Sequence, residues 1–81
     1  MFKMTVTDAI NIKGTLLSIA GPCNNIYEFS SPLVDEFGNM YDAHVPLTNY
    51  KVMDNYDKEI ILGINGNYNA KEFIGRVLTS V

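Results

Sequence analysis

The chain has 81 residues, 47% of them hydrophobic, and a formal net charge of −3. A chain of this length holds one small domain, and this hydrophobic fraction is that of a globular protein rather than of a disordered one. The single cysteine, Cys23, excludes an intrachain disulfide and with it the class of small disulfide-rich secreted domains. We therefore expect one domain over residues 1–81.

Acidic residues are concentrated in the middle of the chain. Residues 26–59 contain seven acidic residues and two lysines, whereas the two ends together have more basic than acidic residues. A surface that follows a nucleic-acid backbone needs clustered Lys and Arg, so direct nucleic-acid binding is not expected. The apolar runs are too short to span a bilayer, and no basic-then-apolar leader precedes the first strand, so we expect a cytoplasmic protein without membrane contact.

The first eighteen residues alternate between apolar and polar side chains. Because successive side chains of a strand point to opposite faces, this alternation predicts one apolar face, in which Asp8 is the polar interruption, and one face of Lys and Thr side chains. Gly14 follows Lys13 at the point where the chain can reverse, and glycine supplies the positive φ of a tight turn. We predict that a hairpin over residues 1–20 founds the domain. Its apolar face would consist of the even-numbered residues Phe2, Met4, Val6, Ile10, Ile12 and Leu16.

Turn signals divide the middle of the chain. Turn-forming residues bracket residues 26–29, which we predict to be a short strand. The Gly38-Asn39 pair predicts a type II′ hairpin with arms at 33–37 and 40–47. On the second arm, the alternation places Tyr41, Ala43, Val45 and Leu47 towards the core, and Met40, Asp42 and His44 towards solvent.

The next segment combines a loop and a strand. Residues 48–57 are polar and tyrosine-rich and form the longest predicted loop. Residues 58–64 carry an almost continuous apolar run, which is typical of a strand covered on both faces. A turn at residues 65–67 closes this strand.

The C-terminal residues are compatible with two structures. Residues 70–81 show apolar side chains at helical spacing, and Asn69 before them resembles a helix cap. Gly75 and the β-branched residues after it instead favour a strand. One structure is an amphipathic helix over 70–81. The other is a single helical turn over 70–74, ended by Gly75 and followed by a closing strand over 76–81.

These elements together predict a mainly β fold. We expect a small single-domain barrel or rolled antiparallel sheet with at most one short helix near the C-terminus. The alternative is an α+β fold in which residues 70–81 form the C-terminal amphipathic helix.

The opening residues also resemble a known family. Residues 2–15 read F-x-M-x-V-x-D-x-I-x-I-x-G-T, which is similar to the opening of the β-barrel domain that follows the GTPase domain in elongation factor Tu and other translational GTPases. Residues 73–78 are loosely similar to the strand that closes that barrel, whereas the first turn lacks the Arg-Gly pair usual in the family. The resemblance implies a closed six-stranded barrel that binds or docks. It does not imply GTP hydrolysis, since no G-x-x-x-x-G-K-[ST] loop is present to hold phosphates.

No combination of residues predicts catalysis, a cofactor or a metal ion. His44 is the only histidine and is expected to face solvent from a strand, whereas a metal site needs three or four convergent ligands. Cys23 would need His44 as its base to act as a nucleophile, and no local pattern brings the two together. The paired acids at 35–36 and at 54–57 lie in predicted turns, where carboxylates are usually solvated. An enzyme is therefore the least expected class.

The long loop and its flanks contain the candidate functional residues. Exposed tyrosine rings combine rigid apolar area with a hydroxyl group and are enriched at protein interfaces. Acidic residues beside them would attract a partner with a basic surface. We predict that a protein-binding surface is formed by Tyr50, Asp54, Tyr56, Asp57 and Glu59.

Two functions are compatible with this surface. The first is a small acidic protein-binding module of the cytoplasm, whose partner is a protein with a basic surface. The alternative is an inhibitor encoded by a phage or mobile element, which would occupy the basic site of a host enzyme such as a nuclease. Neither function requires a cofactor, and both are compatible with a homo-oligomer.

Overall fold

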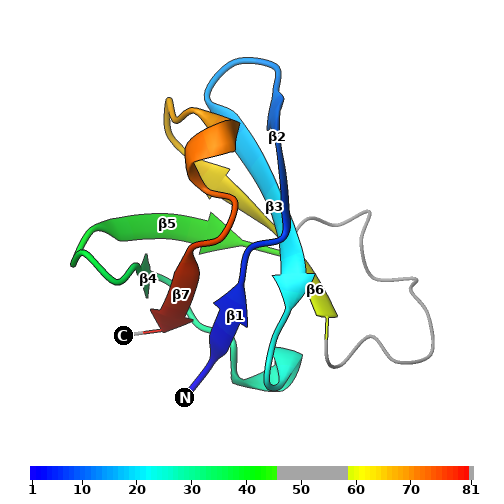
Figure 1. Ribbon diagram of the computed structural model, residues 1–81, viewed down its shortest axis with the longest axis vertical. Helices are drawn as coiled ribbons and strands as arrows, with labels where there is room; N and C mark the ends of the chain where they lie inside the picture. The colour runs from blue at the N-terminus through cyan, green and yellow to red at the C-terminus, as the bar shows by residue number, and fades with distance from the viewer. Residues whose placement is uncertain (46–58, 81) are drawn as a thin grey trace.

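The computed structural model describes residues 1–45 and 59–80 (Figure 1). Within these residues the chain is mainly β, and its helical parts are two single turns of 3₁₀-helix, η1 (Ile26–Glu28) and η4 (Ala70–Glu72). No helix in this part of the chain is long and apolar enough to cross a bilayer. The strands are β1 (Lys3–Thr5), β2 (Asp8–Ile12), β3 (Leu16–Pro22), β4 (Leu33–Val34), β5 (Met40–His44), β6 (Glu59–Asn65) and β7 (Val77–Ser80).

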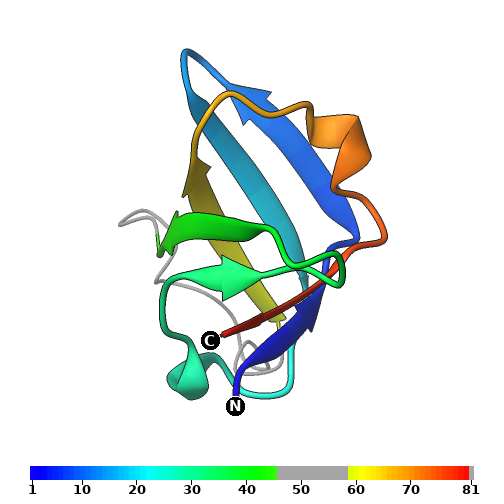
Figure 2. The ribbon, with the colours of Figure 1, turned by 90° about the vertical axis from the view of Figure 1, so that its left-hand side faces the viewer.

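The described strands form one antiparallel sheet in the order β1-β7-β4-β5-β6-β3-β2. Its two end strands, β1 and β2, follow one another in the chain, so the sheet curls round and brings its two ends to one side (Figure 2). A backbone bridge between Met4 and Cys23 joins β1 to the residue after β3. The prediction of a small, mainly β, rolled antiparallel sheet is confirmed.

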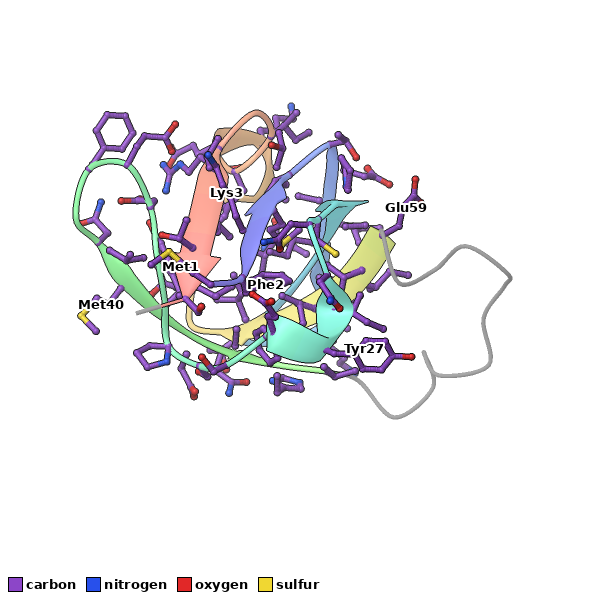
Figure 3. The ribbon with its side chains drawn as sticks, turned by 90° about the horizontal axis from the view of Figure 1, so that it is seen from below. Met1, Phe2, Lys3, Tyr27, Met40 and Glu59 are labelled. Atoms are coloured by element: carbon purple, nitrogen blue, oxygen red, sulfur yellow. The ribbon has the colours of Figure 1, made fainter. Side chains whose placement is uncertain are left out.

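The inside of the curled sheet holds the hydrophobic core. Phe2 lies in the middle of the molecule, among the strands (Figure 3), and its ring packs edge to face on that of Phe29 with 5.4 Å between the centroids. Alternate residues of β3 and β6 join it from the other end of the sheet. The core consists of Phe2, Met4, Val6, Leu17, Ile19, Leu33, Tyr41, Ala43, Ile60, Leu62, Ile64, Ala70, Phe73 and Leu78.

Strand β6 corrects the prediction for residues 58–64. One face of this strand carries Ile60, Leu62 and Ile64 into the core, but Ile61 on the other face is exposed. The prediction of cover on both faces is therefore wrong. A continuous apolar run shows that a strand is hydrophobic, and it does not show that a second layer lies on its outer face.

A β-bulge divides the N-terminal strand. Met4 lies opposite Cys23, so regular pairing would bring Thr7 opposite Ala20. Asp8 lies opposite Ala20 instead, and the Thr7 amide still donates a hydrogen bond of 2.9 Å to the Ala20 carbonyl oxygen. Thr7 and Asp8 therefore both lie opposite Ala20. This β-bulge shifts the alternation of inward and outward side chains by one position.

The bulge determines where the predicted apolar face ends. Before it, the even-numbered residues are buried, whereas after it Ala9 packs against the core and Ile10 and Ile12 are exposed. The prediction that the apolar face of even-numbered residues continues beyond Val6 to Ile10 and Ile12 is therefore wrong. The predicted reversal at Gly14, which has a φ of +77°, is confirmed.

Gly21 allows the bulged strand to approach β3 closely. A Cβ atom at this position would lie 1.9 Å from the carbonyl oxygen of Thr5 and 3.1 Å from the amide nitrogen of Thr7. Because atoms cannot approach so closely, any side chain at position 21 would push the two backbones apart. Glycine inside a strand often marks a close approach of this kind.

Residues 26–29 form η1 and its cap rather than the predicted short strand. Asn25 caps this turn, because its side-chain oxygen accepts a hydrogen bond of 2.9 Å from the Tyr27 amide. The side chain of Asn24 binds β1 instead and accepts a hydrogen bond of 3.0 Å from the Lys3 amide. Asparagine side chains that satisfy backbone groups in this way favour turns over strands.

The C-terminal segment adopts the second of the two predicted structures. The cap residue of η4, Asn69, accepts a hydrogen bond of 3.1 Å from the Lys71 amide. Gly75, with a φ of +94°, follows the turn and precedes β7. Strand β7 pairs with β1 on one side and with β4 on the other, and a helix over 70–81 would forgo these hydrogen bonds. The α+β alternative is therefore wrong.

Candidate functional site

The hairpin between β4 and β5 is closed by residues 35–39, which we call the Asp35 turn. The Asp35 amide donates a hydrogen bond of 3.0 Å to the Asn39 carbonyl oxygen, and Gly38 has a φ of +89°. The hairpin is confirmed at its predicted place. The prediction of a two-residue type II′ turn is wrong, because Val34 pairs with Met40 and five residues lie between them. Gly38 is the fourth of these residues.

The side chain of Asp35 is fully buried beneath this turn. One carboxylate oxygen, Oδ1, accepts hydrogen bonds from the amides of Phe37 and Asn39 at 2.8 and 2.9 Å. The other, Oδ2, accepts hydrogen bonds from the Asn39 side chain at 3.2 Å and from the Tyr41 hydroxyl at 2.7 Å. The expectation of solvated acids at 35–36 is therefore wrong for Asp35, because the turn replaces water with its own hydrogen-bond donors.

Arg76 balances this buried charge from the C-terminal segment. Its Nη1 atom lies 3.2 Å from Asp35 Oδ2 and 2.7 Å from the Tyr41 hydroxyl oxygen. Its guanidinium group also lies over the ring of Phe73, 4.7 Å from the ring centre. A buried carboxylate needs such a partner, because an unpaired charge is costly to remove from water. The contact joins the Asp35 turn to the segment between η4 and β7.

The ring of Tyr41 packs against two other aromatic rings. The rings of Tyr41, Tyr68 and Phe73 contact one another edge to face, with centroid distances of 5.3, 5.1 and 5.6 Å. Tyr41 is buried, as predicted. Edge-to-face contacts favour defined ring orientations, so the cluster holds the hydroxyl in position between Asp35 and Arg76.

The groups of this network keep their charge states at neutral pH. Burial acts to raise the pKa of Asp35, but hydrogen bonds donated by Tyr41, Asn39 and Phe37 outweigh it and lower this pKa to about 2. Burial, and then the hydrogen bond to Asp35, raise the pKa of Tyr41 to about 12. At pH 7 Asp35 is therefore ionised and accepts, while Tyr41 is protonated and donates.

Above the buried network, the hairpin presents apolar side chains to solvent. Phe37 is 74% exposed and Met40 is 56% exposed, and Met40 points away from the body of the molecule (Figure 3). In the sequence, the exposed acids Glu36 and Asp42 lie one residue before Phe37 and two residues after Met40. Glu36 accepts a hydrogen bond of 3.1 Å from the Val77 amide, and Asp42 accepts one of 3.0 Å from the Asn65 side chain. The site thus combines a fixed backbone, an exposed ring and negative charge.

The predicted protein-binding surface lies mostly elsewhere in the chain. Tyr50, Asp54, Tyr56 and Asp57 are outside the described residues, and their role stays a prediction. Glu59 is the exposed first residue of β6. It lies at the edge of the molecule far from Met40 (Figure 3), so it does not belong to the Asp35 turn.

The residues considered for metal or nucleophile chemistry take structural positions. His44 is exposed, as predicted, and its ring lies on Gly63, where an added Cβ atom would come within 2.7 Å of ring atoms. Cys23 is partly buried beside the core, opposite Met4. Across residues 1–45 and 59–80, no three His, Cys, Asp or Glu side chains are placed to hold a metal ion.

The sequence contains a local signal for the Asp35 turn. Aspartate is favoured at the first position of a type I turn and glycine at the fourth, because the carboxylate accepts nearby amides and glycine takes a positive φ. Residues Asp35 to Gly38 follow this pattern. The contacts of Asp35 with Arg76 have no such signal, because the two residues lie 41 positions apart.

Comparisons with known proteins return no match to a protein family, to a curated protein or to a solved structure. The resemblance of residues 2–15 to the barrel domain of translational GTPases therefore stays a prediction.

Proposed function

We propose that the chain is a small, acidic, non-catalytic protein-binding module that acts in the cytoplasm. The observation that carries this proposal is the position of Phe37, an exposed aromatic side chain on a turn whose backbone is fixed by a buried carboxylate. A few well-packed aromatic side chains contribute most of the binding energy of protein interfaces. The single cysteine fits a reducing compartment.

A fixed turn supports tight binding. Ordering of side chains and loops at an interface opposes association. The cost in conformational entropy is roughly 0.5–1.5 kcal/mol for each flexible side chain that becomes immobilised. The amides on both sides of Gly38, those of Phe37 and Asn39, already bind Asp35 Oδ1. The turn therefore has little backbone freedom left to lose when a partner binds the ring.

The charges around Phe37 indicate the chemistry of the partner. Asp35 is paired with Arg76, whereas the exposed acid Glu36 directly precedes Phe37 in the turn. A second exposed acid of the hairpin, Asp42, lies on β5 and accepts a hydrogen bond from the Asn65 side chain. A complementary surface has an apolar pocket for the ring and Lys or Arg side chains at the rim of that pocket. We therefore propose a protein with a basic surface as the partner.

The inhibitor function is a narrower form of this proposal. It requires the basic surface of the partner to be the working site of an enzyme, such as a nuclease. Loss of enzymatic activity on binding would support the inhibitor, and unchanged activity would support a module that only docks.

Affinity capture from cells of the source organism, followed by titration of the purified partner, tests the proposal. Phe37→Ala should weaken binding by about 10-fold or more, because it removes the ring that fills the pocket. Tyr27→Ala is the matched control, because Tyr27 is also an exposed aromatic side chain and lies on η1 (Figure 3). It should leave the affinity within about twofold of the wild type. Both variants should keep the wild-type unfolding midpoint.

Two results would contradict the proposal in different ways. If Phe37→Ala binds like the wild type and Tyr56→Ala does not, the binding surface is the predicted loop rather than the Asp35 turn. If the purified chain turns over a substrate without a partner, the non-catalytic assignment is wrong.

A further inference from the structure

Side chains join the Asp35 turn to the C-terminal strand β7. Strand β4 pairs with β7 at Leu33 and Val34. If it were continued, the same register would set Glu36 opposite Val77. The chain turns away at Asp35 instead, and the Glu36 side chain accepts a hydrogen bond of 3.1 Å from the Val77 amide. A carboxylate therefore takes the place of the strand backbone at this end of β7.

Arg76 makes a second connection from the residue before β7. Its amide donates a hydrogen bond of 3.0 Å to the Phe73 carbonyl oxygen, and its carbonyl oxygen accepts one of 2.9 Å from the Val6 amide. One face of its guanidinium group lies on the Phe73 ring. The side chain is 22% exposed, whereas the carboxylate that it reaches, that of Asp35, is fully buried. A fixed backbone thus places the guanidinium group at the Asp35 turn.

The contact with Arg76 determines the direction of the Tyr41 hydroxyl. Arg76 Nη1 lies 2.7 Å from the hydroxyl oxygen, which has to accept because a guanidinium group only donates. The hydroxyl hydrogen is therefore donated to Asp35 Oδ2, at 2.7 Å. Burial acts to raise the pKa of Asp35, and the hydrogen bond from Tyr41 is the largest of those that lower it. Arg76 therefore supports the buried anion both by its own charge and through Tyr41.

The two oxygens of Asp35 link this support to the backbone of the turn. Oδ2 accepts hydrogen bonds from Tyr41 and Arg76. Oδ1 accepts them from the amides of Phe37 and Asn39. A buried carboxylate that loses its cation is strongly destabilised, because its charge is costly to keep away from water. Without Arg76, the side chain of Asp35 would move into water and both amides would lose their acceptor.

We propose that Arg76 is a positioning residue for the Phe37 ring, and that it couples the Asp35 turn to β7. With Arg76 in place the turn is closed. Without it the turn opens locally, while the core strands stay folded. Arg76 acts through Asp35 and needs no contact with a partner. The inference rests on the proposed function for the role of the Phe37 ring, but the state of the turn can be measured on the chain alone.

The coupling acts in both directions, because a binding event that favours one state of the turn also favours the contacts of that state. A partner that binds the closed turn should therefore stabilise the start of β7. The Val77 amide, which donates to Glu36 in the closed turn, should then exchange more slowly. Loss of the Arg76 contact should conversely weaken binding at Phe37.

Amide hydrogen exchange of the purified chain at pH 7, followed by NMR, tests the inference. Arg76→Met removes the guanidinium group and keeps an apolar side chain for the Phe73 ring. The Phe37 and Asn39 amides should then exchange within about 10-fold of the rate in an unstructured peptide, while the amides that pair β3 with β6 stay at least about 100-fold slower than that rate. Lys71→Met is the matched control, because it removes a positive charge from an exposed residue of η4. It should leave the exchange of both turn amides as slow as in the wild type.

A second substitution separates the charge of Asp35 from packing. Asp35→Asn removes the buried charge, and its side-chain oxygen can still accept hydrogen bonds from the two turn amides. The double variant Asp35→Asn/Arg76→Met should therefore fold and keep both amides at least about 30-fold slower than in an unstructured peptide. The inference is overturned if Arg76→Met alone leaves the turn amides as slow as in the wild type. It is also overturned if the double variant has an open turn or does not fold, because Arg76 would then act by packing.

Titration of the captured and purified partner separates this inference from the proposed function. Arg76→Met should weaken binding by about 10-fold or more, because only the closed fraction of the turn binds, and the double variant should bind within about threefold of the wild type. If Phe37→Ala weakens binding and Arg76→Met with its open turn does not, the positioning role is wrong and the proposed function stands. If the turn opens as expected but Phe37→Ala leaves binding unchanged, the proposed function is wrong and the coupling of the turn to β7 stands.

Discussion

The Asp35 turn and strand β2 both present apolar side chains to solvent, but different contacts hold them. The Asp35 turn is fixed from beneath by a buried carboxylate, a tyrosine hydroxyl and a guanidinium group. Strand β2 is held by backbone pairing with β3 and by the side chain of Asn11 on its other edge. The turn therefore depends on specific side chains, whereas β2 depends on the course of its backbone.

This difference determines how each region responds to substitution. In the turn, loss of one side chain leaves several buried polar groups without a partner. In β2, the outward side chains can change freely, and the sensitive position is the glycine that allows the bulge. The following changes test that contrast.

The largest effect is expected for Asp35→Ala. This change removes the acceptor for two backbone amides and a hydroxyl and leaves Arg76 without its carboxylate, so it should lower the free energy of unfolding by about 4 kcal/mol. Urea unfolding at pH 7 measures the loss. A loss below about 1 kcal/mol would show that the turn does not depend on the carboxylate.

The next largest effect is expected for Gly21→Ala. The new methyl group would meet the Thr5 carbonyl oxygen, and separating the two backbones should cost about 3 kcal/mol. Gly14→Ala is the control. It makes the same substitution in the turn between β2 and β3, where an added Cβ atom would have no atom within 4 Å. Its positive φ alone should cost about 1 kcal/mol. Equal losses for the two variants would contradict the close approach at the bulge.

Acid should weaken the turn through Asp35. The pKa of Asp35 is lowered from 3.8 to about 2 in the folded chain, so the charged form stabilises the fold above about pH 4 and this contribution disappears as the pH falls through 2. Asp35→Asn has no such contribution. The difference in unfolding free energy between wild type and Asp35→Asn should therefore shrink by about 2 kcal/mol between about pH 5 and pH 2. A constant difference would mean that Asp35 is not selectively stabilised as the anion.

The smallest effect is expected for Ile10→Thr. It should change the free energy of unfolding by no more than about 0.5 kcal/mol, because Ile10 is 60% exposed. Ile19→Thr, on the same sheet but fully buried, should cost about 2–3 kcal/mol because it places a hydroxyl in the core. Thermal unfolding of the two variants side by side measures the contrast, and similar losses would show that Ile10 belongs to the core.

Local signals in the sequence were sufficient for much of the fold. The reversal at Gly14 follows from a glycine at a position of positive φ. Gly75 also has a positive φ, but the sequence was compatible with both a helix over 70–81 and a turn followed by a strand.

The alternation on β5 follows from a period of two as far as Ala43, since Tyr41 and Ala43 are buried. The prediction that Val45 faces the core is wrong, because Val45 lies beyond the end of β5 and is 47% exposed. Leu47 lies outside the described residues.

The remaining features depend on contacts that no local pattern contains. The bulge at Thr7 and Asp8 depends on β3, where Gly21 allows the two backbones to approach closely. The apolar residues therefore continue at even positions in the sequence, whereas the side chains that point inward change from even to odd positions. The Asp35 turn has a local turn signal, but its burial depends on Tyr41 and Arg76, which other strands and turns bring to it.

The most direct test of the central claim is amide hydrogen exchange at Phe37 and Asn39, followed by NMR. If Asp35 fixes the turn that presents the Phe37 ring, both amides are hydrogen-bonded to its buried carboxylate. They should exchange about 100-fold or more slowly than in an unstructured peptide, even though they lie at an exposed hairpin end. Exchange of both amides at the unstructured rate would show that the turn is not fixed and would contradict the account.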